Sequence, residues 1–259
     1  MILLLSVLLI FNVIIEFLPI SSTAHLVLIN KILNINYNIN IVLAVSQIGI
    51  ILAVCYYFRN FIKEIIVNLF KLNKKYFLFC LKIFITMLPT VLVGLMFYKT
   101  IKTYCQSNIS IGICLLLGSL LMLMAEKFYS EKNNSDLVNI SFKDATKIGL
   151  LQGLSLISGF SRSATTISAG LLSNFSRKKA VEMAFFVSIP VSFGGAFFDL
   201  YKSMNMIKTG DLWILFYIFV VSFILSLFFM KKILNFIINN SLYIFIYYRI
   251  VFGVLLMFI

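Results

Sequence analysis

Charged residues are scarce in this chain of 259 residues. Asp, Glu, Lys and Arg together make up 12% of it, and only nine residues are acidic. Hydrophobic residues make up 61%, whereas soluble domains contain about 45–50%. The mean hydropathy is +1.04. This composition excludes a soluble globular protein and predicts a polytopic membrane protein in which residues 1–259 form a single membrane domain.

Cysteine and histidine are also rare. The four cysteines lack the spacing of metal-ligand motifs, so they predict neither a disulfide nor a metal centre. The chain has one histidine, His25. Any imidazole chemistry must therefore come from that residue.

Acidic residues are too few to balance the basic ones, which leaves a net charge of +13. Such a charge can indicate binding to nucleic acid. In membrane proteins, however, Lys and Arg gather in cytoplasmic loops, where they set the orientation and meet anionic lipid headgroups. We therefore expect membrane lipids, and no nucleic acid, as partners.

Long apolar runs are abundant. A membrane-spanning helix needs about 20 mostly apolar residues. We predict an all-α integral membrane fold with six transmembrane helices, at 41–58, 77–98, 108–126, 180–199, 212–230 and 243–259.

Two further apolar regions, 1–33 and 144–174, are each interrupted by a polar segment. The first polar segment covers residues 16–25 and the second covers residues 158–166. Each half of an interrupted region is too short to cross a membrane comfortably.

Both polar segments contain a helix breaker, Pro19 in the first and Gly159 in the second. Broken backbone at membrane depth is tolerated only where protein or a wet cavity surrounds it. We therefore predict two re-entrant helical hairpins, each with its polar segment at the tip.

The two polar segments match each other at a constant offset along the chain. Ser21-Ser22-Thr23-Ala24 aligns with Ser161-Arg162-Ser163-Ala164, and at the same offset Asn12 aligns with Gln152. Each polar segment is followed by three of the six predicted spans. This order indicates two structural repeats.

We place the repeats at roughly 1–126 and 144–259, joined by a cytoplasmic loop at 127–143. Three spans per half is an odd number, so the halves must have inverted topology. In that arrangement the two hairpin tips can meet near the middle of the bilayer.

The distribution of Lys and Arg favours one orientation of this fold. With segment 59–76 in the cytoplasm, the cytoplasmic loops hold 13 of the 22 basic residues. Those loops are 59–76, 127–143, 175–179 and 231–242.

The polar segments carry residues typical of two chemistries. Arg162, with hydroxyls and a glycine beside it, is typical of phosphate binding. Glu16 and His25, with Ser21 and Ser22 between them, are typical of acid–base or metal chemistry. Ionisable residues inside a membrane are functional candidates. Together they predict a membrane enzyme that acts on a phosphorylated lipid.

The segment from Glu16 to His25 closely resembles the first signature of the bacitracin-resistance family of undecaprenyl-diphosphatases. The segment from Gly159 to Thr166 resembles the second signature. Looser similarity at 47–53, at 185–190 and at the pair Tyr248-Arg249 extends the resemblance over nearly the whole chain.

This resemblance implies a plasma-membrane (inner-membrane), multi-pass enzyme whose site opens to the extracytoplasmic side. The implied reaction is hydrolysis of undecaprenyl diphosphate to the monophosphate and inorganic phosphate. It would recycle the lipid carrier for cell-wall glycan synthesis and confer bacitracin resistance. The resemblance also implies a divalent cation, Mg²⁺ or Ca²⁺. Whether the protein forms a homodimer is left open.

Carried over residue by residue, the resemblance implies that Glu16, Ser22, His25 and Arg162 are catalytic. It also implies that Glu16 and Asn12 bind the metal. The substrate-binding positions are Ser21, Ser161, Ser163, Thr166 and Gly159.

The chain departs from the family pattern at two positions that matter for chemistry. The family usually has Glu or Gln at the position of Asn12, and Pro at the position of Ser158. An amide can hold a metal-bound water, but it cannot supply charge or accept a proton. This departure allows a weakened enzyme that only binds polyprenyl phosphates.

Two further alternatives remain at this stage. Inverted repeats with broken helices are common in transporters, so a polyprenyl-phosphate flippase is the second functional hypothesis. Glu16 together with His25 favours an enzyme, because a carrier has no need of a general base. Glu16 and Arg162 could also form a structural ion pair, and Arg249 is expected to be structural or supporting.

Overall fold

The structure is a computed structural model that describes all residues except 1, 34–38, 106, 131–135, 208 and 259. The described residues form eleven α-helices and no strand, which confirms the all-α class. Residues 131–135 of the predicted loop 127–143 lie outside the described part.

Five helices are long enough and apolar enough to cross a membrane. They are α3 (Ile39–Tyr57), α5 (Lys74–Tyr104), α6 (Asn108–Lys127), α9 (Arg177–Ser203) and α10 (Leu212–Asn239). Each of the first five predicted spans lies within or almost within one of them.

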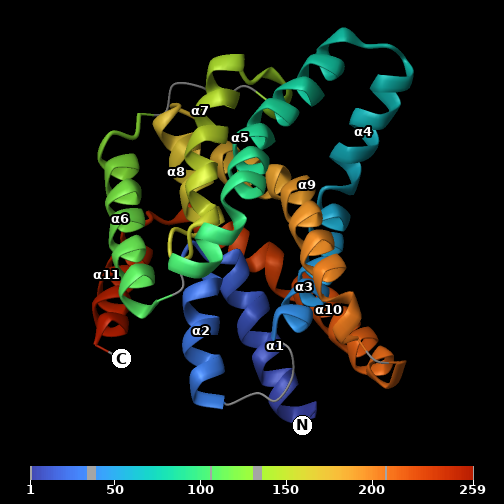
Figure 1. Cartoon of the computed structure of the whole chain (residues 1–259). Coiled ribbons are helices and arrows are strands. Elements are labelled where there is room, and N and C mark those ends of the chain that lie inside the picture. The colour runs from blue at the N-terminus through green and yellow to red at the C-terminus, as the bar shows by residue number, and fades with distance from the viewer. Residues whose placement is uncertain (1, 34–38, 106, 131–135, 208, 259) are drawn as a thin grey trace.

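The sixth predicted span corresponds to α11 (Tyr243–Met257), which is shorter than expected. Its 15 residues rise about 22 Å, whereas the hydrocarbon core of a bilayer is about 30 Å thick. It packs lengthwise along α6 (Figure 1).

Each of the two interrupted apolar regions forms a pair of helices joined by a turn. The first pair is α1 (Ile2–Phe17) and α2 (Ser22–Leu33), and the second is α7 (Phe142–Gly153) and α8 (Arg162–Leu172). In Figure 1 the pairs enter the bundle from opposite ends, α1–α2 from below and α7–α8 from above. Their turns meet in the middle, where the Ser163 hydroxyl donates a hydrogen bond of 3.1 Å to the Leu18 carbonyl.

Both turns end in a serine with left-handed backbone. The φ angle is 72° at Ser21 and 69° at Ser161. Such angles are uncommon outside glycine and mark places where the surrounding structure holds the chain. The helices α2 and α8 begin directly after these serines.

Close helix packing depends on glycine at several crossings. A Cβ on Gly49 of α3 would lie 2.6 Å from the Phe219 carbonyl oxygen of α10. A Cβ on Gly149 of α7 would lie 2.6 Å from the Thr86 carbonyl oxygen of α5. Small residues allow this approach, which supplies much of the packing energy between membrane helices.

The remaining elements lie at the two ends of the bundle. Helix α4 (Arg59–Phe70) packs against α5 at the upper right of Figure 1. In the described part of the chain, four short 3₁₀ turns lie between longer helices. They are η1 (Leu137–Asn139) between α6 and α7, η2 (Leu154–Leu156) between α7 and α8, and η3 (Met204–Met206) and η4 (Thr209–Asp211) between α9 and α10.

An ion pair ties three helix ends together. Arg177 at the start of α9 contacts both carboxylate oxygens of Glu126, at 2.6 and 3.0 Å. The same carboxylate accepts a 2.6 Å hydrogen bond from the Leu242 backbone N–H before α11. Arg177 therefore does more than supply positive charge to a loop.

We expect Gly49→Ala to destabilise the protein, because the added methyl meets the backbone and the Ser222 side chain of α10. Overpacking of this kind costs about 1–3 kcal/mol. Thermal unfolding of the detergent-solubilised protein measures the effect. Gly194→Ala is the matched control, since no atom lies within 4 Å of its added Cβ. An unchanged melting temperature for Gly49→Ala would contradict the close α3–α10 crossing.

Candidate active site

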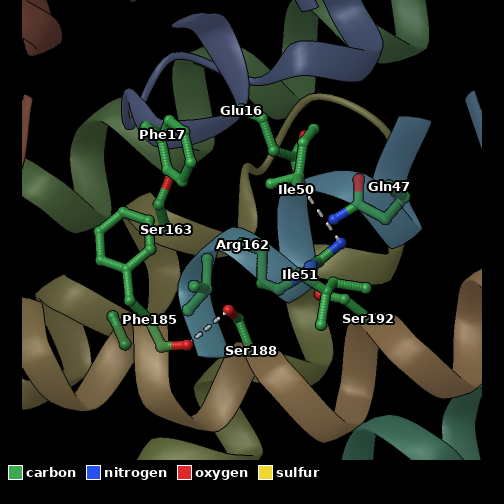
Figure 2. A pocket seen from close by; sticks show the side chains of 12 residues that line it. Glu16, Phe17, Gln47, Ile50, Ile51, Arg162, Ser163, Phe185, Ser188 and Ser192 are labelled. Carbon is green, nitrogen blue, oxygen red and sulfur yellow. Dashed lines mark hydrogen bonds and ion pairs between the residues drawn. The ribbon is translucent and has the colours of Figure 1, made fainter. Parts of the chain in front are cut away.

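Two small cavities lie where the hairpin turns meet, and both are lined by Glu16, Arg162 and Ser163. The first has a volume of about 30 Å³ and lies against α3 and α9 (Figure 2). The second, of about 50 Å³, lies between the two turns. We define this pair of cavities as the candidate active site.

Glu16 uses its two carboxylate oxygens differently. One oxygen accepts a 2.6 Å hydrogen bond from the Ser22 hydroxyl. The other lies 3.8 Å from an Arg162 nitrogen, which is ion-pair distance but too long for a hydrogen bond. This is the contact that a hydroxyl nucleophile needs with a general base.

Arg162 is the cation of the site. Its side chain is 31% exposed and that of Glu16 is 16% exposed. One guanidinium nitrogen donates a hydrogen bond to the Ser192 hydroxyl of α9, and Figure 2 shows the group pointing into the first cavity. The 3.8 Å separation of Arg162 from Glu16 and the partial exposure of both side chains do not fit a fully buried structural ion pair.

Hydroxyl groups from both turns line the second cavity. They belong to Ser21, Ser22, Thr23, Ser155, Ser161 and Ser163. Because α2 and α8 both start here, the partial positive ends of two helices lie at the same cavity. Helix N-termini with hydroxyls and an arginine form a site suited to phosphate.

The hydroxyl groups of the two turns are paired in the same way in each half. Ser21 Oγ lies 3.1 Å from Thr23 Oγ1, and Ser161 Oγ lies 3.2 Å from Ser163 Oγ. The two pairs occupy matching positions of the aligned polar segments, so the repeat found in the sequence extends to these hydrogen bonds.

His25 is close to the site but does not line either cavity. Its Nδ1 lies 2.8 Å from the Ser21 carbonyl, and its Nε2 lies 2.6 Å from the Tyr248 hydroxyl. A carbonyl only accepts, so Nδ1 carries the proton. The ring also stacks on Phe252, with 4.2 Å between centroids. The structure thus places His25 against α11 and not beside Glu16 or Arg162.

Asn12 bonds to the neighbouring helix α3. Its amide donates a 2.9 Å hydrogen bond to Ser46 Oγ, which lies 2.8 Å from Ser222 Oγ. This buried polar chain links α1, α3 and α10. The Asn12 amide N–H is thus engaged with α3, and the expected metal-binding role of Asn12 and Glu16 stays a prediction.

Gly159 and Thr166 have no surface on either cavity. Gly159 has a φ of 107°, and a Cβ there would lie 2.6 Å from the Ile111 carbonyl oxygen, so glycine is required by backbone and packing. Thr166 is buried and its hydroxyl has no partner among the described residues. Both were predicted to bind substrate; neither lines the two cavities, and that role stays a prediction.

The sequence assigned no site role to residues of α3 and α9, although the family resemblance included 47–53 and 185–190. Gln47, Ser188 and Ser192 line the first cavity. Ser188 and Ser192 are four residues apart on one face of an apolar helix. Hydroxyls on the same face of a membrane helix usually point toward other helices, and this spacing was the available signal.

The site offers limited protein ligands for a divalent cation. The described residues contain no group of three or more His, Cys, Asp or Glu side chains that could hold a metal. Glu16 is the one carboxylate among the described residues that line the cavities. Mg²⁺ is commonly held by one or two carboxylates together with substrate phosphates and water, so this donor set fits a cation that binds with the substrate.

The family model described as bacitracin resistance protein BacA matches residues 6–255. The chain belongs to this family. Five spanning-length apolar helices and this membership make it a multi-pass membrane protein.

Several relatives carry the name undecaprenyl-diphosphatase. The protein of Nitrosospira multiformis is 39% identical over 210 residues, which are 81% of this chain and 77% of the relative. That of Nitrosomonas europaea is 41% identical over 198 residues, 76% of this chain and 72% of the relative. A protein from Methanococcus aeolicus is 36% identical over 219 residues, 81% of this chain and 79% of the relative. The resemblance to the bacitracin-resistance family is thus confirmed.

We expect Arg162→Lys to lose at least tenfold in phosphate release while the protein still folds. Lysine keeps the charge but lacks the planar pair of donors that grips a phosphate and also reaches Ser192. Activity and the melting temperature are measured on the same preparation. Lys178→Arg is the control, because its ion pair with Glu182 is exposed and remote from the cavities. Near-normal turnover of Arg162→Lys would remove Arg162 from the site.

Proposed function

We propose that this chain hydrolyses undecaprenyl diphosphate to undecaprenyl phosphate and inorganic phosphate. The observation that carries the proposal is the Glu16–Ser22 pair, which faces Arg162 where two broken helices begin. The names of the relatives support the same reaction and the same polyprenyl diphosphate substrate.

The electrostatics of the site suit a diphosphate. Arg162 can grip the oxygens of one phosphate through two donors and follow the charge that develops as the bond breaks. The starts of α2 and α8 add partial positive charge from opposite halves. The prenyl chain would extend into the bilayer while the phosphates stay between the turns.

The Glu16–Ser22 pair supplies the proton acceptor. We propose that Ser22 Oγ attacks the terminal phosphorus and passes its proton to Glu16. The bond to the bridging oxygen breaks, and undecaprenyl phosphate leaves. Water then hydrolyses the phosphoserine, which releases inorganic phosphate and restores Ser22. Positioning and charge neutralisation dominate such reactions.

A divalent cation, Mg²⁺ or Ca²⁺, would be held by Glu16 together with phosphate oxygens. Its contribution would be to neutralise charge on the diphosphate. Asn12 would support the site only indirectly, through the chain to Ser46 and Ser222.

We propose that α11 completes six spans and that α1–α2 and α7–α8 are re-entrant hairpins of two inverted repeats, roughly 1–126 and 144–259. Support comes from the opposed entry of the two pairs (Figure 1) and from the left-handed serines at matching positions, Ser21 and Ser161. The extent of each repeat remains a proposal.

We propose an orientation in which the site opens away from the cytoplasm. The predicted cytoplasmic loops lie together at one end of the helix bundle, and this clustering supports the orientation. A polar cavity of about 600 Å³ is lined by residues from 57–64, 75–76, 136–138 and 176–182. The end of the predicted loop 231–242 joins the same region, because the Leu242 N–H donates a hydrogen bond to the Glu126 carboxylate that pairs with Arg177.

The decisive experiment is phosphate release from undecaprenyl diphosphate by the purified protein, with and without Mg²⁺. We expect turnover that is lost on chelation and falls at least a hundredfold in Glu16→Gln, because the amide cannot accept the Ser22 proton. General-base help is typically worth about 10²–10⁴-fold. Glu64→Gln is the control, since that carboxylate bonds Tyr76 far from the turns. A wild type that binds lipid but releases no phosphate would favour the binding or flippase hypotheses.

The role of His25 follows from its two hydrogen bonds. We propose that it acts through Nδ1, which fixes the Ser21 carbonyl next to Ser22. Thr165 is the matching position in the second half, and its hydroxyl donates a 3.0 Å hydrogen bond to the Ser161 carbonyl. Thr165 therefore makes in the second half the same kind of hydrogen bond, to the backbone carbonyl four residues earlier, that His25 makes in the first half.

We expect His25→Ala to lose more than tenfold in turnover and His25→Thr to recover a large part of that loss. The threonine hydroxyl can donate to the carbonyl four residues earlier, as Thr165 does. The measurement is kcat for phosphate release, with melting temperatures alongside. If both variants fold and are equally inactive, the positioning role through Nδ1 is wrong, and the catalytic role that the family resemblance implies for His25 is favoured.

A further inference from the structure

Arg249 of α11 is fully buried, with no exposed surface. Its guanidinium donates hydrogen bonds to Ser119 Oγ at 3.3 Å and to the Leu115 carbonyl at 3.3 Å, both on α6. It also bonds the Pro19 carbonyl at 3.3 Å and the Gly159 carbonyl at 3.0 Å. One side chain thus reaches both hairpin turns.

The two turn carbonyls that Arg249 binds are equivalent in the two halves. Pro19 and Gly159 align with each other at the same offset as Ser21 and Ser161. Each lies two residues before a serine with left-handed backbone. The two nitrogens of the guanidinium, Nη1 and Nη2, contact one turn each.

A glycine on α6 leaves room for the Arg249 guanidinium. A Cβ on Gly118 of α6 would overlap Arg249 Nη2 and lie 3.2 Å from the Phe160 carbonyl oxygen. A buried guanidinium is costly unless its donors are used, and here four contacts to oxygen use them. Lysine would present its three donors from one nitrogen, so it could not reproduce the planar arrangement in which Nη1 and Nη2 each contact one carbonyl.

The chemistry proposed above needs groups from both turns at once. Glu16 and Ser22 flank the first turn, whereas Arg162 follows the second. A displacement of about 1 Å between reacting groups can cost about a hundredfold in rate. A group that holds both turns at fixed separation therefore controls their alignment.

We infer that Arg249 is the positioning residue of this enzyme: it joins the two hairpin turns through the Pro19 and Gly159 carbonyls and so aligns the Glu16–Ser22 pair with Arg162. The inference rests on the proposed function. Arg249 does not line the two cavities.

Two variants test the bridge from opposite sides. Arg249→Lys keeps the charge and removes the bridge, and Gly118→Ala keeps the arginine and displaces its guanidinium. For each we expect kcat for phosphate release to fall at least tenfold per folded molecule, with KM changed less than threefold. The second turn, which carries Arg162, would still bind phosphate.

Gly253→Ala is the matched control at the same α6–α11 crossing. Its Cβ would lie 3.1 Å from the Gly112 carbonyl oxygen and 3.1 Å from Leu115 Cβ, and no guanidinium atom of Arg249 is among the three nearest atoms. We expect its kcat to stay within twofold of wild type. Folded protein is counted by size-exclusion chromatography and melting temperature in every case.

The outcomes separate the alternatives. If Arg249→Lys turns over within twofold of wild type, or if losses in both variants match the loss of folded protein, Arg249 is only structural and the inference is wrong. If Arg249→Lys does not fold, Gly118→Ala decides by the same kcat criterion. A wild type without phosphate release would instead overturn the proposed function, so the two failures are distinguishable.

Discussion

Each break in a membrane helix leaves backbone carbonyl and amide groups without their usual helical partners. In hydrocarbon no water can replace those partners, so the protein must supply them. Two such breaks meet in the centre of this bundle. Side chains from α2, α8 and α11 bond the carbonyl oxygens of the turns, namely those of Leu18, Pro19, Ser21, Gly159 and Ser161.

This requirement also determines the packing around the turns. Arg249 needs the absence of a side chain at Gly118, and the second turn needs glycine at position 159 because α6 lies against it. Ala24 and Ala164, the first small residues inside α2 and α8, are both buried. Small residues therefore stand where another backbone segment or the Arg249 guanidinium must approach closely. The hydroxyls and charges that remain face the two cavities.

The sequence predicted the features that arise from composition and chain order. The apolar runs located the spans, and the helix breakers located the turns. The serines of both turns and Arg162 were identified because polar groups within apolar runs are expensive and therefore conspicuous. Side-chain directions could not be obtained in the same way. Asn12 and Glu16 share a helical face by spacing, but the spacing did not reveal that the Asn12 amide donates a hydrogen bond to Ser46 of α3.

Contacts between segments far apart in sequence were the least predictable. Ser192 joins the site only because α9 packs beside α8, and His25 meets Tyr248 although the two lie near opposite ends of the chain. The ion pair of Arg177 with Glu126 was hidden in a basic run that reads as an ordinary cytoplasmic flank. The bridge made by Arg249 depends on two helices, α6 and α11, and two turns at once. No local pattern encodes such a contact.

The size of the cavities has a consequence for affinity. Volumes of about 30 and 50 Å³ hold a few water molecules, not a diphosphate with a prenyl chain. For a bound diphosphate the space around the turns would have to widen, and the free energy of that opening would be subtracted from the free energy of the contacts in the filled site. A dissociation constant measured for the lipid would equal the intrinsic constant divided by the fraction of open molecules. Tight recognition and weak apparent binding are thus compatible in the same site.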